Sequence, residues 1–136
     1  MYKKILVPVA LDHGHDPEDA IAIAKTFSGD GTEIILLHVL EEIPSYVSSE
    51  LPDDIFDNAQ KGLKSELNTV ASNAGANVRG VVVMGHAGST INNYAEENGI
   101  DCIVIASHRP EWSDYLLGST AARVVRHASC SVHVIR

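Results

Sequence analysis

Cysteine is scarce in this sequence: only Cys102 and Cys130 occur among 136 residues, and they lie far apart in the chain. A disulfide framework needs several cysteines, and a thiolate zinc site needs them in closely spaced pairs, so we expect neither. Sparse cysteine is also typical of proteins that stay in the reducing cytoplasm, which is where we expect this one. His13 and His15 lie in a polar stretch and are expected to be solvated, so no metal site is predicted.

Positive charge is scarce as well. The chain has ten Lys and Arg residues and eighteen Asp and Glu residues, which gives a net charge of −8 with the histidines neutral. Nucleic acids and anionic membranes repel such a protein, so neither is expected as a partner. No apolar run approaches the ~20 residues of a membrane-spanning helix. Residues 1–4 lead directly into an apolar run without a small-residue cleavage site, so we expect no signal peptide.

Apolar residues make up 45% of the chain and charged residues 21%, which are ordinary values for a globular protein. A chain of this length buries roughly two-thirds of its unfolded surface, which is enough for a core without a metal or a disulfide. We therefore expect residues 1–136 to form one domain, without repeats or linkers.

Short apolar runs alternate with amphipathic segments along the chain. Unbroken apolar stretches, such as 5–9, 34–37 and 102–105, are typical of strands that are buried on both faces of a sheet. The expected strands cover residues 5–9, 33–40, 78–84, 101–106 and 131–135. Between them, apolar residues recur at helical spacing in four segments. Five strands alternating with four helices predict a doubly wound α/β domain with a parallel sheet.

Local signals predict the helix boundaries and the helix faces that pack on the sheet. Asp53 and Ser89 are expected to cap the second and third helices, and the Gly-Asp-Gly stretch at 29–31 is expected to end the first. The side chains expected to pack on the sheet are Ala20, Ile23, Ala24 and Phe27; Phe56, Ala59, Leu63, Leu67, Val70 and Ala74; Ile91, Tyr94 and Ala95; and Ala121, Val124, Val125 and Ala128.

One end of the predicted sheet carries the residues suited to binding a ligand. In doubly wound sheets, ligands bind at the carboxyl ends of the strands where the strand order reverses, here residues 8–10 and 105–107. Residues 118–120 begin the last helix and leave backbone amides free at the positive end of its dipole, which suits a phosphate. Alternatively, Gly118 and Ser119 only form the turn and cap the helix.

Several separated motifs resemble the universal stress protein family over essentially the whole chain. They are residues 1–8, Leu-His-Val at 37–39, Ala-Glu-Glu-Asn-Gly-Ile-Asp at 95–101, and Leu-Gly-Ser at 117–119 continuing to Cys-Ser-Val at 130–132. Ala-Ser-His-Arg-Pro at 106–110, with Tyr-Leu-Leu-Gly-Ser at 115–119, is similar to a smaller branch of short bacterial stress proteins. These motifs occur in the order and spacing of the family.

The resemblance implies the strand order 3-2-1-4-5, a homodimer through the last strand at 131–135, and ATP, with Mg²⁺, bound at the ends of the first and fourth strands. Residues 8–10 would line the base and ribose, Val39 would pack on adenine, and the backbone of Ile105 would contact its edge. By position, the residues that would contact the nucleotide are Pro8, Val9, Ala10, Val39, Ile105, Ala106, Ser107, His108, Arg109, Gly118, Ser119 and Thr120.

The sequence departs from the family's nucleotide-binding pattern in the phosphate loop and at the end of the first strand. Ala106 and Arg109 stand where ATP-binding members have glycines, and only eight residues separate Arg109 from Gly118. Ala10 replaces the aspartate usual near the end of the first strand. Arg109, as the only cation in its loop, could bind a phosphate with its forked guanidinium. Alternatively, its bulk fills the site.

The resemblance favours an ATP-binding regulatory module of the stress response, with an unknown regulatory partner and little or no catalysis. No catalytic residue is predicted from the sequence. A slow ATPase or nucleotidyl-transfer enzyme is one alternative, for which the loop offers only Glu111 and Asp114. A dimeric interaction protein that binds no nucleotide is the other.

Overall fold

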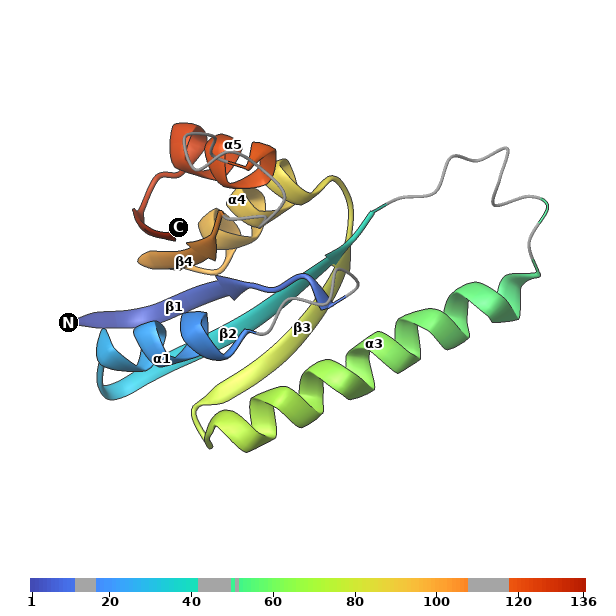
Figure 1. The fold of residues 1–136 in the computed structure, drawn as a ribbon, viewed down its shortest axis with the longest axis horizontal. Coiled ribbons are helices and arrows are strands. Elements are labelled where there is room, and N and C mark those ends of the chain that lie inside the picture. The colour runs from blue at the N-terminus through green and yellow to red at the C-terminus, as the bar shows by residue number, and fades with distance from the viewer. Residues whose placement is uncertain (12–16, 42–49, 51, 108–117) are drawn as a thin grey trace.

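The computed structural model describes residues 1–11, 17–41, 50, 52–107 and 118–136. Within these ranges five strands form one sheet in the order β3-β2-β1-β4-β5. All neighbouring strands run parallel (Figure 1). The strands are β1 (Tyr2–Pro8), β2 (Ser28–Leu40), β3 (Val78–Met84), β4 (Cys102–Ala106) and β5 (Ser131–Ile135). The predicted fold class and strand order are therefore confirmed.

Four helices in the described ranges cover the sheet. They are α1 (Glu18–Thr26), α3 (Asp53–Ala74), α4 (Ala87–Glu97) and α5 (Ser119–His127). α1 and α3 lie on one face of the sheet, and α4 and α5 lie on the other (Figure 1). None of these helices is both long and apolar enough to cross a membrane.

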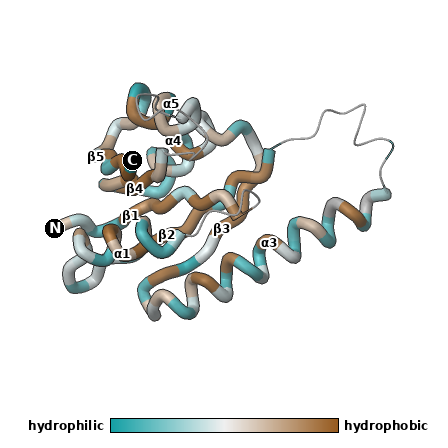
Figure 2. Tube along the Cα trace, viewed as in Figure 1, coloured by the Kyte–Doolittle hydropathy of each residue, from teal (hydrophilic) through white to brown (hydrophobic). Residues whose placement is uncertain are grey.

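Alternation along the central strands explains the uninterrupted apolar runs. Successive residues of a strand point to opposite faces, so a strand that is covered on both faces needs apolar residues throughout. In β1, Ile5 and Val7 pack in the core beneath α1 and α3, whereas Leu6 packs in the core beneath α4 and α5. All three are fully buried. Figure 2 shows the same pattern, with hydrophobic positions along the strands and hydrophilic ones mainly on the helices.

The start of β2 differs from the prediction. α1 ends at Thr26, before the Gly-Asp-Gly stretch at 29–31, and that stretch belongs to β2. Thr32 explains how it joins the sheet, because its hydroxyl accepts a hydrogen bond from the Gly29 amide (2.9 Å) and donates one to the Tyr2 carbonyl (2.6 Å). The pairing of β1 with β2 shifts register at this point. A tertiary hydrogen bond therefore extends the strand through residues that locally favour a turn.

The predicted side-chain caps are wrong. α4 begins at Ala87, ahead of Ser89, and α3 begins at Asp53 itself; neither helix has a side-chain cap at its N-cap residue. The first amide of α4 is bound instead by a carboxylate from the end of β2: the Ala87 N–H donates to Oε1 of Glu41 over 3.1 Å. This partner lies 46 residues earlier in the chain, so a local sequence pattern cannot identify it.

Most residues of the predicted helix stripes are buried or half-buried, but Ala59 is exposed and Val125 is 46% exposed. The N-terminal half of α3 extends past the sheet, which leaves Ala59 without a surface to pack on (Figure 1). α5 contacts the edge strand β5, so its outer flank has no further strand to cover it. Leu67 is fully buried where α3 crosses β3. The side chain of Phe56 lies outside the described part of the structure.

The packing of α3 on β3 predicts that alanine substitutions at two glycines change the stability of the protein in opposite directions. A Cβ at Gly80 would lie 2.7 Å from Cγ of Leu67, which is too close without a shift of the helix. Gly80→Ala should therefore destabilise the protein by ~1–3 kcal/mol, measured by urea unfolding. Gly62, on the exposed side of α3, has no atom within 4 Å of such a Cβ. Gly62→Ala is the matched control and should stabilise by ~0.5–1 kcal/mol. Equal effects of the two substitutions would contradict this packing.

Candidate crevice at the carboxyl ends of the strands

A crevice of about 1310 Å³ lies at the carboxyl ends of the strands. Ligand pockets for small molecules commonly measure about 300–1,000 Å³, so the crevice has room for a nucleotide. Nearly all the residues predicted to contact a nucleotide line it: Pro8, Val9, Ala10, Val39, Ile105, Ala106, Ser107, Gly118, Ser119 and Thr120. His108 and Arg109 lie outside the described residues, as do Glu111 and Asp114. The structure therefore brings the described members of the predicted set to one place.

The crevice opens where β1 and β4 separate. The ladder between these two strands comprises only the pairs Ile5–Cys102 and Leu6–Ile103. On its other side, β1 stays paired with β2 as far as Pro8, and the Val9 N–H continues the ladder by donating to the Leu37 carbonyl over 2.8 Å. The strand order reverses between β1 and β4, so this is the position where doubly wound sheets bind ligands.

The amides at the start of α5 are the main polar groups at this point. Gly118 is the N-cap residue, and no side chain caps the helix. The first amide bonded within the helix is that of Ala122, which donates to the Gly118 carbonyl over 2.8 Å. Among the described residues, the preceding amides, at 119–121, therefore have no acceptor and lie at the positive end of the helix dipole. An anion placed there would gain hydrogen bonds and a favourable field.

Gly118 is also required by packing. A Cβ at this position would lie 3.0 Å from the Ser107 carbonyl oxygen, so the backbone after β4 and the start of α5 approach closely. Ser107 itself is buried and held by β5, because its N–H (2.9 Å) and its hydroxyl (3.2 Å) both donate to the Ile135 carbonyl. The hydroxyl of Ser107 therefore has a structural partner already, and its oxygen can only accept from a ligand.

His38 holds the end of β1 at the wall of the crevice. The side chain is 1% exposed, and Nδ1 lies 3.1 Å from the Val9 carbonyl oxygen. A carbonyl only accepts, so Nδ1 carries the proton in this bond. Nε2 has no hydrogen-bond partner within the described part of the chain. His38 is therefore a buried core residue that is hydrogen-bonded at Nδ1.

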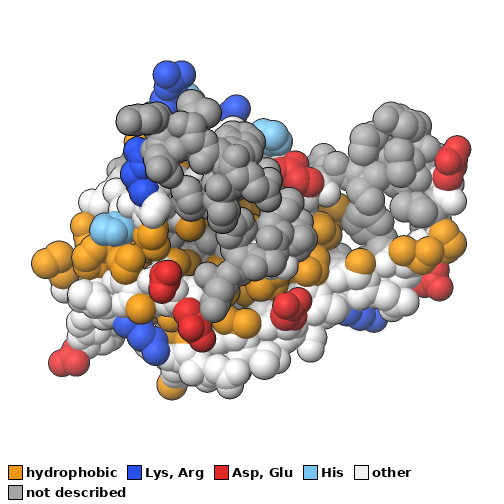
Figure 3. Space-filling view, in the orientation of Figure 1, with side chains coloured by type: hydrophobic (Ala, Val, Ile, Leu, Met, Phe, Trp, Pro, Cys, Tyr) orange, Lys and Arg blue, Asp and Glu red, His pale blue; other side chains and the backbone are white. Residues whose placement is uncertain are grey.

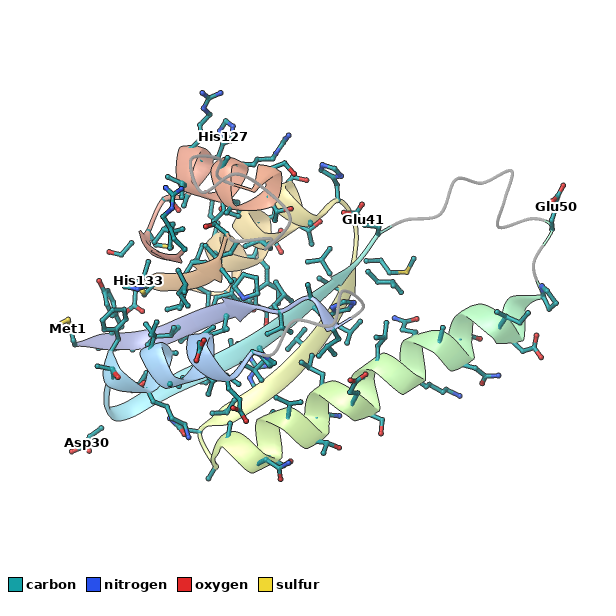
Figure 4. The ribbon with its side chains drawn as sticks, viewed as in Figure 1. Met1, Asp30, Glu41, Glu50, His127 and His133 are labelled. Carbon is teal, nitrogen blue, oxygen red and sulfur yellow. The ribbon has the colours of Figure 1, made fainter. Side chains whose placement is uncertain are left out.

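Charged side chains that the sequence reasoning did not select also line the crevice. Glu41, at the end of β2 beside the start of α4 (Figure 4), is joined by His86, whose Nδ1 lies 3.5 Å from Oε2. Arg123 and Arg126 of α5 line the crevice as well. Arg123 lies four residues after Ser119, and helical spacing places the two on one face. That spacing is the signal that could have revealed Arg123 in advance.

Neither thiol is activated for chemistry. Burial, followed by repulsion from Cys130 and Asp101, raises the pKa of Cys102 to about 11. Burial also raises the pKa of Cys130. Thiols with raised pKa values carry little thiolate at neutral pH and are poor nucleophiles and poor metal ligands. Among the described residues, no three His, Cys, Asp or Glu side chains come together as a metal site.

Comparison with known proteins agrees with this geometry. The model of the universal stress protein family matches residues 1–136. The chain belongs to this family. Universal stress protein G of Shigella flexneri is 32% identical to this universal stress protein over 142 aligned residues, and the alignment covers all of both chains.

Solved structures agree as well. The structure of MJ0577, a universal stress protein of Methanocaldococcus jannaschii, superposes with a TM-score of 0.80 at 28% identity and covers 99% of this chain and 96% of that one. A universal stress protein from Archaeoglobus fulgidus, solved in complex with dAMP, superposes with a TM-score of 0.64 at 19% identity. That alignment covers 99% of this chain and 98% of the other, and it shows the shared fold.

The hydrogen bond between His38 and the Val9 carbonyl predicts how substitutions of His38 change the stability of this universal stress protein. His38→Leu removes the side-chain donor to the carbonyl of the half-buried Val9, whereas His38→Asn keeps a donor on a short side chain. We expect the Leu variant to unfold more easily than the Asn variant, by ~1 kcal/mol in urea titrations, although Leu is the more apolar residue. A Leu variant as stable as the Asn variant, or more stable, would show that this hydrogen bond does not support the strand end.

Proposed function

We propose that this universal stress protein binds an adenine nucleotide, ATP with Mg²⁺, in the crevice and acts as a homodimeric regulatory module with little or no catalysis. The observation that carries the proposal is the uncapped start of α5 at the point where β1 and β4 separate. A phosphate bound there would accept hydrogen bonds from amides that have no other partner in the helix. The relative solved with dAMP supports an adenine nucleotide as the class of ligand.

The walls of the crevice suit the remaining parts of the ligand. Val39 and the end of β1 would enclose the adenine between apolar surfaces, and the backbone at Ile105 would meet its polar edge. Ala10 offers no side-chain acceptor to the ribose. Mg²⁺ would be held chiefly by phosphate oxygens and water, as is usual for this ion, because the described residues contain no ready metal cluster.

An interaction protein without a nucleotide is the second candidate. One observation favours it. A Cβ at position 118 would lie 3.0 Å from the Ser107 carbonyl oxygen, so close packing is by itself a reason for glycine there. Under this alternative the crevice would be only a by-product of the strand order, and the protein would act through its dimer surface.

Calorimetric titration with ATP and Mg²⁺ separates the two candidates. We expect saturable binding at up to millimolar ATP, with turnover far below the ~1–10³ s⁻¹ of typical enzymes. Arg109→Ala should weaken the binding by about 1.5–3 kcal/mol, as expected for the loss of a charge-assisted hydrogen bond. No heat at millimolar ATP would support the second candidate. Tighter binding by the Arg109→Ala variant would mean that this side chain fills the site.

The homodimer is proposed to form at the open edge of β5. The Ile135 carbonyl accepts from the Ser107 N–H and so points toward β4. Because backbone groups of successive residues point to opposite sides of a strand, the N–H and C=O of Val132 and Val134 point to the open edge. β5 of a second copy could pair there in antiparallel fashion about a two-fold axis, which would cover an apolar edge that is otherwise prone to aggregate.

This arrangement predicts the effect of one proline. Val134→Pro removes a donor from the open edge and leaves the donors toward β4 intact, so the protomer should fold and the dimer should be lost. Val134→Thr keeps the N–H and should remain dimeric. Light scattering at micromolar concentration gives the masses. A monomeric wild-type chain, or a dimeric proline variant, would contradict the β5 interface.

A further inference from the structure

Positive side chains gather on α5 although the chain as a whole is acidic. The net charge is −8, yet Arg123 and Arg126 both line the crevice. Neither arginine forms an ion pair within the described ranges. Figure 3 shows Lys and Arg side chains over α5 in the upper part of the view, whereas most Asp and Glu side chains lie over α1 and α3. Within the described ranges the crevice is therefore lined by two arginines that have no ion-pair partner.

Arg123 is the better placed of the two arginines. It lies one helical turn after Ser119, which is about 6 Å farther along the axis of α5, and it shares a face with Ser119. Arg126 lies almost another turn away. An anionic group that extended beyond the free amides of α5 would therefore come within reach of Arg123 first.

The aliphatic stem of Arg123 packs against a glycine on the neighbouring helix. Gly88, in the first turn of α4, is buried, and a Cβ there would lie 2.6 Å from Cδ of Arg123. The aliphatic part of Arg123 therefore lies directly over the backbone of α4. Arg123 as a whole is nevertheless exposed, so a ligand in the crevice can reach it.

Acidic groups near the crevice do not neutralise Arg123. Asp19 and Glu41 also line it, but the carboxylate of Glu41 already accepts the Ala87 N–H and lies beside His86. Within the described residues the guanidinium of Arg123 has no carboxylate partner, and a free guanidinium is suited to bind a phosphate with two parallel hydrogen bonds.

We propose that Arg123 binds the outer phosphates of a nucleotide whose inner phosphate lies at the start of α5. The crevice then prefers nucleotides that carry a phosphate chain over monophosphates, because only a chain extends from the first turn of α5 to the second. This inference rests on the proposed function for the identity of the base, but its phosphate part can be tested separately. Arg123 is a binding residue here and takes no part in bond breaking.

The test compares two nucleotides and one inorganic probe. Binding of ATP, AMP and tripolyphosphate is measured by calorimetry for the wild type and for Arg123→Met, in which Met keeps an aliphatic stem over Gly88. We expect the wild type to bind ATP at least tenfold more tightly than AMP. Arg123→Met should lose about tenfold or more in affinity for ATP and for tripolyphosphate, and should bind AMP as before. Lys64→Met, on α3 and outside the crevice, should change none of these affinities.

Each outcome decides the inference. Equal loss of ATP and AMP affinity in Arg123→Met, or equal affinities of the wild type for both, would overturn it. If neither nucleotide binds but tripolyphosphate binds and Arg123→Met weakens it, the proposed function fails and the role of Arg123 stands. If tripolyphosphate does not bind the wild type, the role of Arg123 fails. Arg123→Lys keeps the charge and much of the stem, so it should retain part of the ATP preference even if the Met variant folds poorly.

Discussion

The short ladder between β1 and β4 is the constraint on which the rest of the structure depends. Only two residue pairs join these strands, Ile5–Cys102 and Leu6–Ile103, and this ladder ends before either strand does. β1 continues alongside β2, while β4 continues alongside β5, so the sheet divides at its centre. The division creates the crevice, and the helices that follow the strands place their N-terminal amides around it. A longer β1–β4 ladder would close the place where the ligand is proposed to bind.

The starts of α4 and α5 differ in the charged groups around them. The starts of α4 and α5 both bring free amides to the rim of the crevice, and the protein treats them differently. At α4 the carboxylate of Glu41 accepts a hydrogen bond from one of these amides, that of Ala87. At α5 no side chain caps the helix, and arginines of the same helix line the rim. Of the two helix starts, the one at α5 therefore has amides that no carboxylate of the described residues occupies, which favours an external anion there.

The sequence could predict features that depend on local periodicity. Uninterrupted apolar runs identified strands covered on both faces, and helical spacing identified Leu67, Ile91, Ala95 and Val124 as buried. Features set by distant partners could not be predicted. The cap of α4 comes from Glu41, and the early start of β2 depends on a bond from Thr32 to Tyr2. From the sequence alone, Gly88 is an ordinary turn residue. The structure shows that the stem of Arg123 covers it.

The central claim is that the free amides of α5 hold the phosphate of the ligand. Nuclear magnetic resonance of the ¹⁵N-labelled protein during titration with ATP and Mg²⁺ tests it most directly. The account predicts large, saturable shifts of the Ser119, Thr120 and Ala121 amides, with the amides of Lys64 and Ser65 on the outer side of α3 unchanged. Saturable binding of ATP that leaves the three α5 amides unshifted would contradict the account.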